Sequence, residues 1–237
     1  MKKLFLAALA ALACMGLYAQ SFELSDDGEL IVDSDNWSMW SSDSSFGWGY
    51  HVMIDGDAEF LDNTTTFGRN REIFFTLIGG EFRPVKFLGL SGCLDLNWDT
   101  YRLRKNAYYW EPDGNGAVSV KPLEGSPYLK IRKSVQRSFG FDLPVQLKIH
   151  LGNLCIAGGV VGEFNFSGVT LTKALDQNGE KVKFKDKEIQ THPFTYSYRA
   201  SITYDHLGIY GKYSPCSQFV QGFGPQFSYW TVGLILW

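Results

Sequence analysis

The sequence lacks any apolar run of about 18 residues beyond residue 19, which excludes a membrane-spanning α-helix in that part of the chain. It also lacks an excess of basic residues, since the formal charge of the 237 residues is −3, and nothing in this balance points to nucleic acid. Cysteine is scarce, with four residues in all. One of them, Cys14, lies in the N-terminal leader, and the odd number left argues against a disulfide framework. No cofactor is expected.

The leader has the order of a secretory signal peptide. Two lysines precede the apolar run Leu4–Leu12, and Ala19 stands before a predicted cleavage site at Gln20. We therefore expect residues 1–19 to be removed, which changes the formal charge from −3 to −5. The alternative is a lipoprotein in which Cys14 is the lipidated residue.

Residues 20–43 are predicted to be an acidic periplasmic tail. They contain no lysine or arginine. The segment 33–36 begins like a calcium loop, but the glycine and glutamate that an EF-hand places downstream are missing, so no metal site is expected. The acidic residues of the tail are Glu23, Asp26, Asp27, Glu29, Asp33, Asp35 and Asp43.

Apolar and polar residues alternate from Val135 to Ile149, far beyond the usual strand of about 5–6 residues. A tilted strand that crosses a membrane needs about 9–11 residues, with apolar side chains towards lipid and polar ones towards the lumen. Abundant glycine and aromatic residues also suit a barrel, with small residues inside and aromatic girdles at its rims. The alternation therefore predicts an outer-membrane β-barrel.

Eight strands are predicted, at 45–54, 72–83, 88–99, 135–149, 154–167, 193–205 and 207–213, with the last ending at Trp237. Long connections at 55–71, 102–132 and 173–191 alternate with short turns. The parity of the second strand is ambiguous, and Gly79–Gly80 could mark a bulge where it switches. We expect an all-β fold: residues 44–237 as an eight-stranded antiparallel up-and-down transmembrane barrel in the cell outer membrane, with short periplasmic turns and long extracellular loops.

The end of the chain resembles the small PorT-like outer-membrane β-barrel family typical of the Bacteroidetes. The matching residues are Lys212–Pro215, Phe219, Gly222–Pro225, Ser228 and Val232–Leu234. The resemblance implies that the last strand, with its terminal Trp237, is recognised by the barrel-insertion machinery. The chain departs from the pattern where Thr231 and Gly233 interrupt the apolar alternation. The resemblance implies no enzymatic activity.

Several charged residues have the parity that faces the lumen. Because an eight-stranded barrel is just wide enough for side chains to fill, and because both signs occur, we expect a buried salt-bridge network that plugs it. The alternative is a conduction path. The predicted network contains Asp95, Asp99, Asp142, Lys148, Glu163, Arg199 and Lys212.

No catalytic residue is expected. A surface lipase or protease needs a nucleophile, a histidine and a carboxylate that converge at the outer rim. His150 and His206 fall in predicted periplasmic turns, His51 shares its parity with glycines, and His192 is near the outer rim. No serine has the context of a nucleophile elbow.

Basic residues gather in the predicted extracellular loops and could pair with lipopolysaccharide phosphates. The alternative is an ordinary solvated loop surface, because Glu180, Asp186 and Glu188 are interleaved with the lysines. The predicted lipopolysaccharide contacts are Arg102, Arg104, Lys105, Lys130, Arg132, Lys133, Lys181, Lys183 and Lys185.

These patterns together predict a non-catalytic outer-membrane protein with a structural, adhesive or envelope-interaction role, in contact with outer-membrane lipid. Two alternatives remain open. A small porin-like solute channel would need a lumen with less paired charge. A secreted lipocalin-like barrel would turn the apolar parity inward around a ligand.

Overall fold

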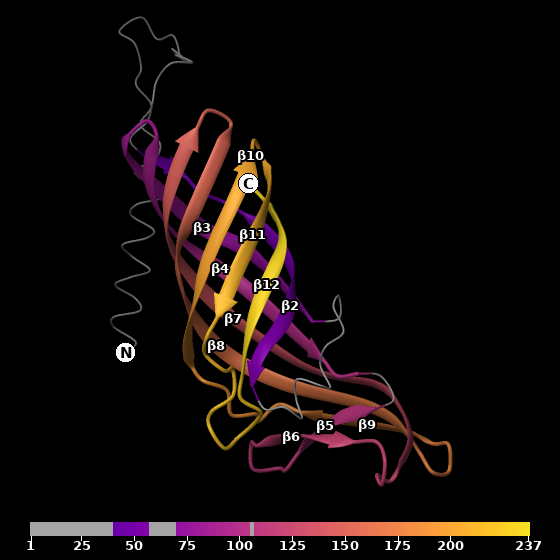
Figure 1. Ribbon diagram of the computed structural model, residues 1–237. Coiled ribbons are helices and arrows are strands. Elements are labelled where there is room, and N and C mark those ends of the chain that lie inside the picture. The colour runs from indigo at the N-terminus through magenta and orange to yellow at the C-terminus, as the bar shows by residue number, and fades with distance from the viewer. Residues whose placement is uncertain (1–39, 57–69, 105–106) are drawn as a thin grey trace, which may run out of the picture.

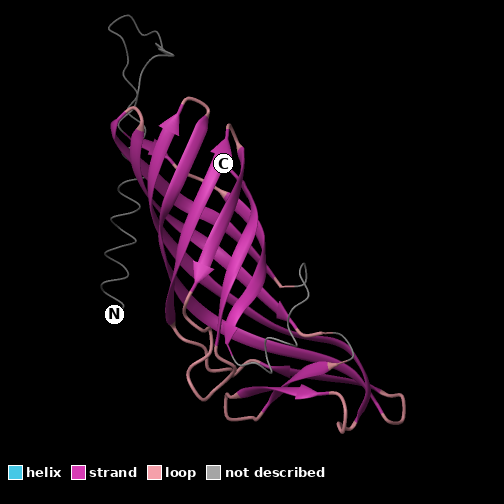
Figure 2. Ribbon diagram, viewed as in Figure 1, coloured by secondary structure: helices cyan, strands magenta, loops and turns pink. Residues whose placement is uncertain are grey.

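The computed structural model describes residues 40–56, 70–104 and 107–237. Among these residues no helix is long and apolar enough to cross a membrane. Strands dominate the described chain (Figure 2). They are β1 (Trp40–Ser42), β2 (Phe46–Gly56), β3 (Arg71–Val85), β4 (Leu88–Arg102), β5 (Tyr108–Pro112), β6 (Val118–Pro122), β7 (Tyr128–Leu151), β8 (Leu154–Asp176), β9 (Lys181–Asp186), β10 (Phe194–Tyr204), β11 (Leu207–Ser214) and β12 (Phe227–Leu236).

Eight of these strands form a closed ring, which confirms the predicted fold. The order is β2-β3-β4-β7-β8-β10-β11-β12, every pair is antiparallel, and β12 pairs back to β2. The closing pair is in register over most of its length, with Trp48 opposite Leu234. Closure leaves no exposed strand edge in the ring, as a strand-built membrane protein requires (Figure 1).

The apolar residues, which occupy every second position of the strands, face outward. On β7, Val145 and Leu147 are 55% and 50% exposed, whereas Gln146 and Lys148 between and beside them are buried. The same alternation runs through β10, where Tyr196 and Ile202 are exposed and Arg199 is buried. A lipocalin-like barrel requires the opposite arrangement, so that alternative is wrong. An apolar exterior around a polar interior places the protein in the outer membrane.

The ambiguous parity on β3 has a structural cause. The register of β3 against β4 shifts between Thr76 and Ile78, so the extra residue switches the facing of the strand. As a result both Glu72, before the shift, and Glu81, after it, lie inside the ring. The bulge predicted at Gly79–Gly80 exists but comes earlier in the strand.

The barrel wall begins earlier than predicted. β1 pairs with the end of β3, with Trp40 opposite Phe82, while β2 pairs with the start of β3. β1 and β2 therefore pair with successive parts of β3 and are separated by a break at residues 43–45. Residues 40–42 thus belong to the wall and Asp43 to the break that follows, in contrast to their expected place in the tail; residues 20–39 lie outside the described part of the chain.

β7 and β8 are much longer than predicted, at 24 and 23 residues. Their added length lies beyond the ring, at the end where β5, β6 and β9 are found (Figure 1). There β9 pairs with β8 to give a three-stranded extension, and β5 and β6 form a hairpin. The segments 102–132 and 173–191, which were expected to be loops, thus contain much strand.

Inward glycines on β2 make room for large side chains from neighbouring strands. A Cβ atom at Gly47 would collide with the Phe74 ring, and one at Gly49 would collide with the Tyr210 hydroxyl. Both of these aromatic residues are buried in the lumen. The interior of the barrel is therefore packed with side chains, as expected for eight strands.

Candidate functional site

Lys212 joins two carboxylates in the lumen. Its Nζ donates to Glu72 and, at 3.2 Å, to Oε1 of Glu163. The Tyr210 hydroxyl donates to the other oxygen of Glu72 at 3.1 Å, and Ser197 donates to Glu163 at 2.7 Å. This group draws on β3, β8, β10 and β11 and so connects strands around the ring.

Arg199 forms a second charged group with Asp95. Its Nη2 lies 3.1 Å from Oδ2 of Asp95, and the Thr76 hydroxyl donates to the other carboxylate oxygen at 2.7 Å. The guanidinium also lies over the Phe74 ring, 4.6 Å from its centroid. Both charged side chains are almost fully buried, where a missing partner costs several kcal/mol, roughly.

Lys148 forms a third group at the end with the short turns. Its Nζ lies 2.7 Å from Oδ2 of Asp43 and 3.3 Å from Oε2 of Glu81, and it sits over the Trp237 ring. Glu81 also accepts from Arg83 at 2.6 Å. The break between β1 and β2 thus brings Asp43 into the lumen.

His51 marks the opposite end of the polar interior. Its Nε2 lies 3.2 Å from Oδ1 of Asp99, and its Nδ1 lies 2.8 Å from the Thr231 hydroxyl. The imidazole stacks on the Tyr101 ring with centroids 5.0 Å apart. Because Tyr101 belongs to an apolar cluster above it, His51 lies where the charged lumen meets a hydrophobic layer.

The structure places every predicted lumen residue inside the barrel. Asp95, Asp99, Asp142, Lys148, Glu163, Arg199 and Lys212 are all buried. Asp142 makes no ion pair with a described residue. The residues opposite it on the two neighbouring strands, Asp95 and Glu163, are also carboxylates. Sequence reasoning missed Asp43, Glu72 and Glu81 as further members of this interior.

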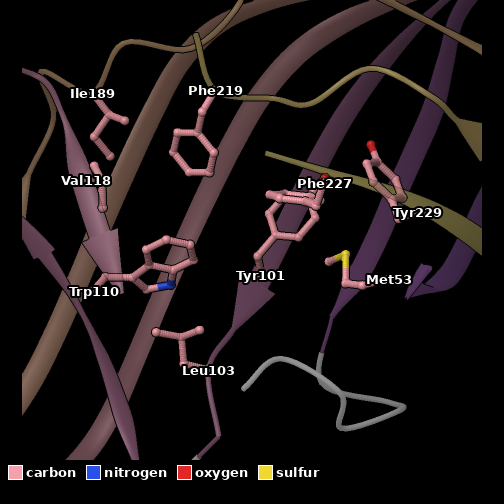
Figure 3. Close-up of a cluster of buried hydrophobic side chains, with 9 residues drawn as sticks. All are labelled: Met53, Tyr101, Leu103, Trp110, Val118, Ile189, Phe219, Phe227 and Tyr229. Atoms are coloured by element: carbon pink, nitrogen blue, oxygen red, sulfur yellow. The ribbon is translucent and has the colours of Figure 1, made fainter. Parts of the chain in front are cut away.

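An apolar cluster, which we call the cap, lies at the end of the barrel with the long connections (Figure 3). It joins the tops of β2, β4 and β12 to the β5–β6 hairpin and to the loop before β12. Trp110 and Phe219 are its most buried large members from the loop side, and Tyr101 is the most buried from the wall. The full cluster is Met53, Tyr101, Leu103, Trp110, Val118, Ile189, Phe219, Phe227 and Tyr229.

Backbone and hydroxyl bonds hold the hairpin against the extension. The Trp110 amide donates to the Ser134 hydroxyl at 2.8 Å, and the Thr172 hydroxyl donates to the Trp110 carbonyl at 3.0 Å. Ser134 and Thr172 are themselves 2.8 Å apart on neighbouring strands. The cap is therefore anchored to both β7 and β8.

The outward surface of the extension and of the wall just below it is strongly basic. We call this surface the basic face. In its centre Lys133 on β7 lies opposite Lys173 on β8, which in turn lies opposite Lys183 on β9. The face consists of Arg71, Arg102, Lys130, Lys133, Arg137, Lys173, Lys181, Lys183 and Lys185.

No carboxylate shares the outward positions of these described strand segments. The nearby acidic residues are used elsewhere. Asp176 accepts the amides of Asn178 and Glu180 in the turn between β8 and β9, and Asp186 accepts the amide of Glu188. None of the described acidic residues interleaved in the sequence forms an ion pair with a lysine of this face.

A groove of about 250 Å³ runs between the end of β4 and β7. Arg102 and Arg104 line one side, and Arg132 and Lys133 line the other. Lys133 lies on the extension, above the spanning part of β7. Partial burial lowers the pKa of Lys133, and the nearby charges of Arg137, Arg102, Lys173 and Arg71 lower it further. The groove is therefore a site of concentrated positive charge.

The predicted lipopolysaccharide contacts fall into three groups. Arg102, Lys130, Lys133, Lys181, Lys183 and Lys185 lie on the basic face. Arg104 and Arg132 line the adjoining groove, and Lys105 lies outside the described residues. The prediction did not include Arg71, Arg137 and Lys173. Arg137 shares the outward positions of Val135 and Phe139, whereas the outward facing of Arg71 and Lys173 follows from the strand register.

The histidines, cysteines and carboxylates of the described residues form no metal-binding group. Within residues 40–56, 70–104 and 107–237, no group of three or more His, Cys, Asp or Glu could hold a metal ion. His51 and His150 each face a carboxylate, Asp99 and Glu81 respectively. Cys93, Cys155 and Cys216 are free thiols.

The closed ring, its apolar exterior and its charged interior define an eight-stranded outer-membrane β-barrel. No protein-family model matches the chain, and no curated protein matches it significantly. Among solved structures it is similar to Ail, the attachment invasion locus protein of Yersinia pestis: identity is 11%, with 84% of this chain and 99% of that chain covered and a TM-score of 0.36.

A second structure of Ail, in complex with the heparin analogue sucrose octasulfate, gives 10% identity and a TM-score of 0.35. It covers 83% of this chain and 97% of that chain.

Proposed function

We propose that this protein is a non-catalytic, non-conducting outer-membrane barrel with a structural, adhesive or envelope-interaction role. The observation that carries this proposal is the cap over the extracellular mouth. Trp110, Phe219 and Tyr101 are almost fully buried there, and a packed cluster at this end of the lumen would obstruct the exit of a solute. A barrel sealed in this way acts through its outer surface.

The charged interior supports the same proposal. Lys148, Arg199 and Lys212 each face carboxylates on other strands, and these pairs span the ring. A porin-like channel needs an open polar path, whereas paired and buried side chains occupy this lumen.

The proposed partners are the lipids of the outer membrane, including lipopolysaccharide, and the barrel-insertion machinery. The apolar exterior supports lipid contact, and the last strand with Trp237 supports recognition during insertion. We also propose membership of the PorT-like family on the residues near the C-terminus. Trp237→Ala should lower the fraction of folded barrel in cells, and an unchanged fraction would argue against recognition of this residue.

Planar-bilayer recording tests the sealed barrel. The purified full-length protein, inserted under conditions in which a porin gives discrete conductance steps, should give none. Stable ohmic steps from the wild-type protein would overturn the proposal and restore the channel alternative.

A further inference from the structure

The basic face stands directly above the lipid-facing wall. Arg71 and Arg137 both lie opposite Thr100, so one row across three strands carries two arginines. The next outward row towards the membrane holds Trp98 and Phe139, whose ring centroids are 5.1 Å apart. Such aromatic girdles mark the interface between hydrocarbon and headgroups.

Above these rows the like charges are close together. Directly opposed residues of an antiparallel sheet have Cβ atoms about 4.5–5.5 Å apart, and like charges at such positions are destabilising. Lys133, Lys173 and Lys183 occupy three such positions in one row. The six lysines of the face make no ion pair with any described residue. A bound anion would relieve this repulsion.

We propose that the basic face binds the phosphate groups of lipopolysaccharide in the outer leaflet, with the groove between Arg104 and Arg132 holding one phosphate. This inference rests on the proposed function, because it names the partner of the envelope-interaction role. Arginine forks and lysine point charges are the side chains that bind phosphate oxygens best in proteins.

The position of the face selects lipopolysaccharide among anionic ligands. The face continues the outer wall and lies at the extracellular end, which has the long connections. Its lower row adjoins the aromatic residues at the edge of the lipid belt, so the ligand must reach both hydrocarbon and the space just above it. A phosphorylated glycolipid anchored in the outer leaflet has this shape.

Titration of the purified full-length protein in neutral detergent with bisphosphorylated lipid A tests the proposal. The variant Lys133→Gln/Lys173→Gln/Lys183→Gln should bind at least about 10-fold more weakly than the wild type. Arg104→Gln/Arg132→Gln should also weaken binding. This result would show that the groove holds one of the phosphate groups. The control is Lys86→Gln/Lys121→Gln, which removes positive charge from the β3–β4 turn and from β6, away from the face, and should bind as the wild type does.

Three results would overturn the inference. These are equal affinity of the wild type and the lysine variant of the face, equal affinity of the wild type for dephosphorylated lipid A, and equal affinity for phosphatidylglycerol. An unchanged heat-modifiable gel shift must accompany each variant, which shows that the barrel is folded. None of these results bears on conductance. The proposal that the barrel is sealed and the proposal that it binds lipopolysaccharide can therefore be disproved independently.

Discussion

Asp43 and Lys148 form a buried ion pair of 2.7 Å across 105 positions of sequence. Asp43 lies in the break between β1 and β2, and Lys148 lies on β7. The pair therefore ties the first segment of the wall to a strand across the lumen. Glu81 shares the same ammonium group at 3.3 Å, so removal of Asp43 leaves one of two carboxylate partners.

Asp43→Ala should destabilise the barrel, because it takes an anionic partner from a fully buried lysine. Loss of one partner of a buried pair costs about 3–5 kcal/mol, and the remaining Glu81 places the effect at the lower end. The midpoint of urea unfolding in detergent measures it. Asp55→Ala, at an exposed carboxylate on β2, is the control and should leave the midpoint unchanged. Equal midpoints for the two variants would contradict the role of Asp43.

Arg199→Ala should lower the temperature at which the folded band is lost on a gel, because it leaves the buried Asp95 carboxyl group without its cationic partner. The double variant Arg199→Ala/Asp95→Ala should recover part of the loss, since it leaves no unpaired carboxylate at that site. A double variant as unstable as the sum of the two single variants would show that the two residues are not coupled.

Trp110→Ala should loosen the cap and leave the barrel closed. Deletion of a buried tryptophan side chain costs about 3–5 kcal/mol, and here the cost falls on the hairpin and its contacts with Phe219. Limited proteolysis should cut residues 107–123 faster, while the heat-modifiable shift persists. Ser119→Ala on the exposed part of β6 is the matched control. Equal cleavage rates for both variants would count against the cap.

Lys133 should lose its proton at a lower pH than an ordinary lysine, because burial and four neighbouring cations lower its pKa. The pKa of Lys133 is lower in the folded state than in the unfolded state. The free energy of unfolding should therefore rise as the pH increases from the folded-state pKa to the unfolded-state pKa. NMR titration of the isotope-labelled lysine Nζ measures it. Arg137→Gln and saturation with bisphosphorylated lipid A should each raise the pKa. A pKa that neither change raises would contradict the positive field of the basic face.

Sequence alternation alone predicted the ring and its inside and outside. It succeeded where apolar residues mark the lipid side, as on β7 and β10. It failed on β3, because the register shift after Thr76 switches the parity inside one strand. It also failed beyond the membrane, where lysines interrupt the apolar residues at the outward positions of β7, β8 and β9.

The same physical limits explain which site residues were found. The seven predicted lumen residues lie on strands with an unambiguous parity, and all are buried. Glu72 and Glu81 lie on either side of the register shift in β3. The sequence alternation therefore did not predict that both side chains face the lumen. The row of Lys133, Lys173 and Lys183 depends on pairing among three strands, which no single segment encodes.

Membrane fractionation combined with a heat-modifiability gel tests the central claim most directly. The full-length protein should be recovered in the outer-membrane fraction and should migrate differently before and after boiling, because a closed barrel resists detergent until heated. Recovery as a soluble periplasmic or secreted protein, with no change in mobility on boiling, would contradict the outer-membrane barrel and with it the basic face as a lipid-binding surface.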